Sequence, residues 1–135
     1  MPLLIPTASE NKLLEFLLGF ATPGDQILKL YVNDVTPADA DVAATYTEMS
    51  THGYAAKTLL KSGWTVVQNG GVGEGSQAAQ TWTFTAATAV TVYGYFITDT
   101  TTGLLLWAER FTNAKVIQNA GDQIIVTPKF TLSKV

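Results

Sequence analysis

The chain has 135 residues, a formal net charge of −3 and no cysteine. Its length suits one domain with one core, and the lack of cysteine excludes disulfides and thiolate chemistry. The eight basic residues are scattered, which argues against direct nucleic-acid binding. No stretch of about 18 apolar residues is present, so no membrane span or membrane partner is expected. The start, Met1 to Pro6, lacks the basic region of a secretory signal.

Charged residues make up only 14% of the chain, while hydrophobic residues make up 47%. Soluble domains usually contain about 25% charged residues. A small surface with so few charges predicts that part of it is covered by a partner, and self-association is the expectation.

A short helix is predicted to begin near Thr7, which has capping-box spacing to Glu10. Gly19 and the Pro23-Gly24 pair supply the stop. The apolar stripe of the helix consists of Leu13, Leu14, Leu17 and Leu18. We expect residues 1–24 to form an N-terminal helical segment and residues 25–135 a single β-sandwich domain. The helix either lies across the end of the domain, which we favour, or serves as a docking arm for a neighbouring chain.

Seven strands are predicted, over residues 26–33, 54–60, 64–68, 79–85, 90–98, 104–111 and 123–133. Lys61-Ser62-Gly63 predicts a hairpin turn, residues 69–75 a flexible glycine-rich loop, and residues 99–103 a five-residue hairpin loop. Pro128 inside the last strand predicts a bulge or an edge. The predicted fold is mainly β, an antiparallel β-sandwich or jelly roll with one short N-terminal helix.

The run 90–98 is apolar on both faces of the predicted strand. One face carries Val90, Val92, Gly94 and Phe96, and the other carries Tyr93, Tyr95 and Ile97. Such a strand is either central in a sandwich or lies in an interface between chains. The candidate interface residues are therefore Leu13, Leu14, Phe16, Leu17, Tyr93, Tyr95 and Ile97.

No residue pattern specifies a reaction, so we expect no enzyme, no cofactor and no metal. His52 is the single histidine, which leaves no second ligand for zinc and no Gly-x-Ser-x-Gly elbow for a triad. The glycine-rich run 71–75 lacks the Lys-Ser/Thr pair of a phosphate loop. Glu109 is expected to meet a cation across the sheet or at an interface, whereas Arg110 points to the opposite face.

Two weaker alternatives concern oxygen-rich and aromatic residues. The only acidic cluster could hold calcium, although its spacing does not match an EF-hand and turn capping is favoured: Asp34, Asp39 and Asp41. The three tryptophans could stack on sugars, although core positions are favoured because each lies in a strand pattern: Trp64, Trp82 and Trp107.

Two motifs carry a family resemblance. They are Leu30-Tyr31-Val32-Asn33-Asp34-Val35-Thr36-Pro37 and Val92-Tyr93-Gly94-Tyr95-Phe96-Ile97-Thr98-Asp99. Together with the segments that follow each, they resemble small virion proteins of tailed bacteriophages, over the chain from about Leu28 to the end.

The resemblance implies a capsid decoration, or cement, protein. Such a protein is made in the host cytoplasm and binds the major capsid protein on the head surface, commonly as a homotrimer that stabilises the shell. The segment from Met1 to Phe20 would then be the docking element. Two alternatives stay open: a tail, fibre or baseplate component with the same sandwich, and a carbohydrate-binding module if the tryptophans are exposed.

Overall fold

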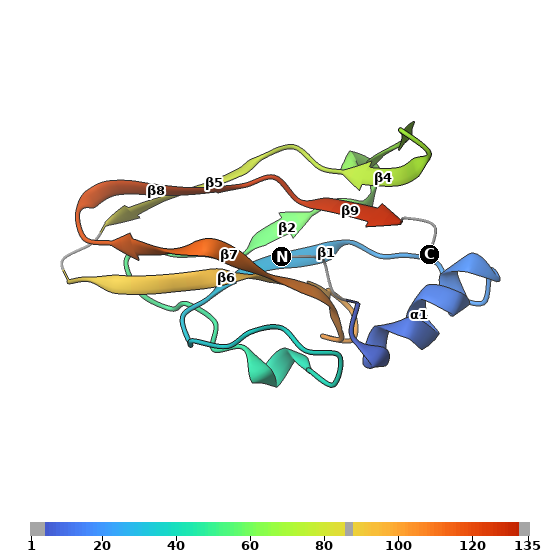
Figure 1. Cartoon of the computed structure of the whole chain (residues 1–135), viewed down its shortest axis with the longest axis horizontal. Helices are drawn as coiled ribbons and strands as arrows, with labels where there is room; N and C mark the ends of the chain where they lie inside the picture. Colours follow the sequence, from blue (N-terminus) through green and yellow to red (C-terminus); the bar gives the residue numbers. More distant parts are fainter. Residues whose placement is uncertain (1–4, 86–87, 133–135) are drawn as a thin grey trace.

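The computed structural model describes residues 5–85 and 88–132. In this part of the chain, strands form two facing layers and one α-helix lies across one end (Figure 1). The fold is mainly β with antiparallel sheets and an N-terminal helix, which confirms the predicted class. The elements are α1 (Thr7–Leu17), β1 (Gln26–Tyr31), η1 (Ala43–Thr45), β2 (Lys57–Leu59), η2 (Lys61–Gly63), β3 (Thr65–Asn69), β4 (Val72–Ser76), β5 (Gln80–Thr85), β6 (Val90–Asp99), β7 (Leu105–Ile117), β8 (Ala120–Val126) and β9 (Lys129–Leu132).

The first layer is a four-stranded sheet in the order β2-β1-β6-β7. The second layer consists of a β5-β8 pair and a β3-β4-β9 sheet, which follow one another along the layer (Figure 1). The Gln77 amide donates a 3.0 Å hydrogen bond to the Pro128 carbonyl and links the two parts. The second layer is therefore a long antiparallel ribbon, widened at one end by β3.

The first layer is buried on both faces, which explains the two apolar faces of β6 without another chain. Its inner face packs against the second layer in the main core, which includes Leu28, Val92, Ile97, Trp107 and Ile124. Its outer face is covered by the segment between β1 and β2, with Tyr31, Tyr46, Phe96, Leu105 and Ala108 forming a second cluster. The predicted interpretation of 90–98 as a central strand is the one that the structure supports.

The predicted division of β6 into faces is wrong at its centre. Between Val92 and Gly94 the pairing with β7 shifts, because the partner of Val92 is Lys115 and the partner of Gly94 is Arg110. The irregular pairing changes which way successive side chains point. Tyr95 therefore joins Val92 in the main core, whereas Tyr93 packs against the second cluster.

Two predicted connections and the last predicted strand also differ from the structure. Residues 61–63 are not a hairpin turn but the short helix η2, which carries the chain from β2 in the first layer to β3 in the second. The glycine-rich run is not a loop: Gly70 and Gly71, with φ of 58° and 82°, form a tight turn, and the residues after them are β4. The last strand is divided at Pro128 into β8 and β9, because proline cannot donate to the ladder.

The helix begins at the predicted residue but without the predicted cap. Pro6 is the N-cap, and no side chain caps the first turn. Instead of bonding Glu10, the Thr7 hydroxyl donates a 3.0 Å hydrogen bond to the Asp39 carboxylate. No helix within residues 5–85 and 88–132 is long and apolar enough to cross a membrane.

Candidate docking surface at the helical end

Helix α1 is held against the edge of the sandwich by a few specific contacts. The buried Ser9 hydroxyl donates a hydrogen bond to the Leu105 carbonyl at the start of β7. The Thr7 amide donates a 3.0 Å hydrogen bond to the Asp39 carbonyl. These contacts place the helix beside the hairpin between β6 and β7, with its first turn anchored to two different segments.

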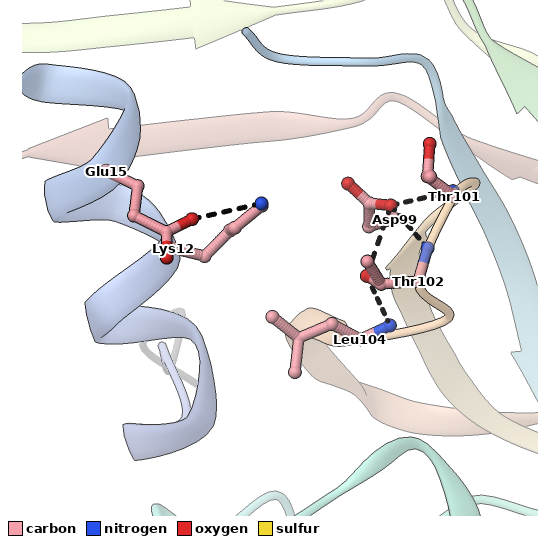
Figure 2. A network of polar contacts seen from close by, with 6 residues as sticks. All are labelled: Lys12, Glu15, Asp99, Thr101, Thr102 and Leu104. Carbon is pink, nitrogen blue, oxygen red and sulfur yellow. Dashed lines mark hydrogen bonds and ion pairs between the residues drawn. The ribbon is translucent and has the colours of Figure 1, made fainter. Parts of the chain in front are cut away.

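The turn that faces the helix is built on Asp99 (Figure 2). Its carboxylate accepts hydrogen bonds from the amides of Thr101 at 2.7 Å and Thr102 at 2.8 Å. Burial alone would raise the pKa of Asp99, but these donors and the positive charge of Lys12 hold that pKa below its usual value. Lys12 extends from α1 and also pairs with Glu15 at 3.1 Å. Asp99, Lys12 and Glu15 therefore have partners within the chain.

Helix α1 and the residues after it carry an exposed apolar surface. Leu17 is 78% exposed and Phe20 is 84% exposed, and the other exposed members are Leu13, Leu14 and Leu18. We call these five residues the leucine face. An exposed cluster of large apolar side chains marks a site of contact with another molecule more often than a feature of the isolated fold.

A largely apolar cavity of about 230 Å³ lies between α1 and the second layer. The helix contributes Leu13 and Phe16 to it, and the sheets contribute Trp64, Trp107 and Phe130. The helix is therefore not packed tightly against the sandwich along its whole length. The cavity adds apolar surface next to the leucine face.

The structure divides the candidate interface residues into two groups. Leu13, Leu14 and Leu17 are exposed and Phe16 is half-buried, so the helical members lie at or near the surface. Tyr95 is 4% exposed and Ile97 is 0% exposed, and both belong to the main core of the chain. Tyr93 is half-buried, with the Arg110 guanidinium 5.1 Å from its ring centre.

Sequence reasoning missed a second exposed apolar site, on β3. All five residues of β3 are exposed, including Val66 at 78% and Val67 at 46%. The consecutive valines place one apolar side chain on each face of the strand, but this local pattern does not show whether either face is covered.

The residues that could take part in catalysis or ligand binding have structural partners in this fold. His52 has a positive φ of 61°, and its ring nitrogens lie 2.5 Å from the Thr51 hydroxyl and 2.6 Å from the Thr88 carbonyl. Neither neighbour is an acid or a nucleophile paired for catalysis. Trp82 and Trp107 are buried, and Trp64 is half-buried and donates to Gln26 at 2.8 Å. None of the three is fully exposed: Trp82 lies in the main core, and Trp64 and Trp107 line the cavity beside α1.

The acidic cluster is dispersed among separate partners. Asp34 pairs with Arg110 at 2.6 Å, and Asp41 accepts a 2.7 Å hydrogen bond from the Tyr46 hydroxyl. Within the described residues, no group of three or more His, Cys, Asp or Glu side chains could hold a metal. Glu109 accepts a 2.5 Å hydrogen bond from the Tyr95 hydroxyl rather than meeting the expected cation.

Comparison with known proteins identifies the family. Residues 5–132 match the family described as Podophage GP4 fiber I protein gp80. The chain belongs to this family. It is a structural protein of a tailed-phage virion, as the two sequence motifs had implied. No curated protein matches the chain.

Proposed function

We propose that the protein is a subunit of a podophage fibre and that it works by assembly rather than by catalysis. The observation that carries the proposal is the family match, which extends over residues 5–132 and therefore includes both the helix and the sandwich. The family description names a fibre, so the fibre alternative fits it better than the capsid decoration role expected from the resemblance. The homotrimer and the major capsid protein were expected for decoration, and the fibre proposal requires neither.

In this proposal residues 1–24 act as the docking arm and residues 25–135 as the β-sandwich body. The partner is another protein of the same virion, with an apolar groove that accepts the leucine face. Fully burying an exposed leucine contributes about 1.5–3 kcal/mol, so the exposed parts of Leu14, Leu17 and Leu18 would supply a share of the binding free energy. Few charges around the helix have to be desolvated, because Lys12 and Glu15 already pair with each other.

The location of the protein on phage particles tests the proposal. Particles carrying a tagged copy of the chain are labelled with gold and viewed by electron microscopy. We expect label on fibres at the tail. Label spread over the head shell would reject the fibre role and restore the decoration role.

A pair of charged variants tests the docking arm. Leu17→Lys with Leu18→Lys is expected to lower incorporation into particles by about tenfold or more, because each lost contact of about 1.4 kcal/mol is worth a factor of ten. Ile125→Lys is the matched control, since Ile125 is also exposed but lies on β8 in the second layer rather than on α1. Equal incorporation of both variants would rule out the leucine face as the docking surface.

A further inference from the structure

Strand β3 is an open sheet edge. It lies at the outside of the β3-β4-β9 sheet, and in the described part of the chain its only strand partner is β4. Alternate backbone N–H and C=O groups along its other side therefore point away from the sheet. An edge of this kind is completed by an added strand, whose own backbone supplies the missing donors and acceptors.

Other edges of the protein carry protection that β3 lacks. β2 has only three residues, one of them Lys57, and β7 carries Arg110 and Lys115. β5 is covered at its end, where the Thr85 amide donates to the His52 carbonyl at 2.9 Å.

By contrast, β3 reads Thr-Val-Val-Gln-Asn and has no charge and no proline. Charges, proline and short length are the usual devices that prevent edge-to-edge pairing.

We propose that β3 pairs antiparallel with β3 of a second copy of this chain, about a two-fold axis at Val67. In this register Val67 faces Val67 of the other copy, Val66 faces Gln68, and Thr65 faces Asn69. Each pair recurs on the other side of the axis, as a two-fold interface requires, and no pair brings two like charges together. The pairing deepens the fibre proposal, because it names a contact between subunits. It rests on the fibre proposal only for where in the virion this contact would form.

Local charge does not oppose the approach of two copies. The acid beside Val67 is Glu74, its partner in the neighbouring strand β4. Glu74 is neutralised by Lys129 at 2.7 Å, and hydrogen bonding to Lys129 lowers the pKa of Glu74. In the paired copies each of these neutral pairs would lie one strand back from the axis, so no like charges would stand directly opposite each other across it.

The contact is expected to be weak for two free subunits. A five-residue strand spans about 17 Å, and a pair of such strands buries less than the roughly 1,200 Å² of a stable interface. Inside a fibre the subunits are held near one another, and the higher effective concentration makes a weak contact sufficient. Covalent trapping is therefore the suitable measurement.

Single cysteines report the register directly, because the natural chain has no cysteine. In the Val67→Cys variant the two new thiols face each other, with Cβ atoms about 4.5–5.5 Å apart, close to disulfide distance. In the Val66→Cys variant the two thiols lie on a diagonal, about 8 Å apart, which is too far. Ile125→Cys is a control for random collision at an exposed apolar position.

The purified full-length variants are oxidised in a glutathione buffer and covalent dimers are counted on non-reducing gels. We expect about tenfold more dimer for Val67→Cys than for Val66→Cys or Ile125→Cys, with circular dichroism showing that all three are folded. Equal yields from the three variants would overturn the proposal. Val67→Cys that links in particles only to a different protein would also overturn it. Since the test uses purified protein, it stands whether or not label is found on fibres.

A charged variant gives an independent measurement. Val67→Lys places an ammonium group at the axis, where it would meet its own copy, and is expected to abolish chemical cross-linking between subunits. Ile125→Lys should leave cross-linking unchanged. Cross-linking that survives in Val67→Lys at the level of the natural chain would count against pairing through β3.

Discussion

Tyr31 and Gly94 face each other across β1 and β6, and the tyrosine ring occupies the space that a side chain at Gly94 would need. A Cβ atom on Gly94 would lie 2.6 Å from the Tyr31 hydroxyl oxygen and would also clash with the Glu109 carbonyl oxygen. Glycine inside a strand often marks such a close approach. At this position the glycine allows Tyr31 to seal the outer face of the first layer.

Gly94→Ala is therefore expected to destabilise the protein. The added methyl group meets backbone on one side and a buried ring on the other, so the free energy of unfolding should fall by about 1–3 kcal/mol or more. Urea denaturation measures the change. Gly73→Ala is the control, because the nearest atom to its Cβ would be Gln68 Nε2 at 3.9 Å. Equal stability of the two variants would contradict the close packing of Tyr31.

The buried tyrosines predict a loss of stability in alkali. Burial raises the pKa of Tyr31 to about 12, an increase that Arg110 opposes and nearby carboxylates reinforce. Burial also raises the pKa of Tyr46, Tyr54 and Tyr95. Since the unfolded pKa is about 10, the unfolded chain loses these protons first, and each tyrosine removes about 1.4 kcal/mol per pH unit above pH 10.

Thermal unfolding between pH 8 and pH 12 checks this prediction. Up to about pH 9 these tyrosines should not change the free energy of unfolding. Between pH 10 and pH 12 their ionisation should make it fall steeply. Tyrosinate absorbance should rise together with unfolding rather than before it. Early ionisation of most tyrosines in the folded protein would contradict their burial.

The strands were predictable where local pattern and tertiary environment agree. In β5, Trp82 and Phe84 are buried while the neighbouring threonines are exposed, as their alternation indicated. The same rule failed in β6, because Tyr93 and Tyr95 are separated to opposite faces by a shift in pairing with β7. That shift depends on how β6 pairs with residues of β7 about twenty positions further along the chain. The alternation of residues within β6 carries no information about this pairing.

The two exposed apolar sites also differ in whether the sequence alone could predict them. The leucine face was visible in the sequence, because Leu13, Leu14 and Leu17 repeat with helical spacing. The edge at β3 was not, because whether Val66 and Val67 are covered depends on which strand lies beside them. A hairpin at 61–63 would have paired β3 with β2. Instead, η2 carries the chain to the second layer, where β3 pairs with β4.

Ser9 is expected to control how firmly α1 is attached. Its side chain is buried and its hydroxyl donates to the Leu105 carbonyl, which Ser9→Ala would leave without that donor. Loss of such a bond costs about 1–3 kcal/mol, and the cost should fall on the helix rather than on the sandwich. Hydrogen exchange should therefore accelerate in α1 and stay unchanged in β6. Uniform acceleration in both elements would show that α1 is part of the same cooperative unit as the sandwich.

Arg110 and Asp34 are expected to contribute unequally although they form one ion pair. Asp34 is largely exposed, and an exposed pair contributes about 0.2–1 kcal/mol, so Asp34→Ala should have a small effect. Arg110 also donates to the Val35 carbonyl at 2.8 Å and lies over the Tyr93 ring.

Arg110→Ala removes all three contacts and should lower the free energy of unfolding by about 2 kcal/mol. Urea denaturation of both single variants and the double variant measures the coupling. We expect the double variant to be close to Arg110→Ala alone, because Asp34 acts through its ion pair with Arg110 and has nothing further to lose once the arginine is gone. Equal losses from the two single variants would mean that the ion pair, rather than the bond to Val35, holds the covering segment on the first layer.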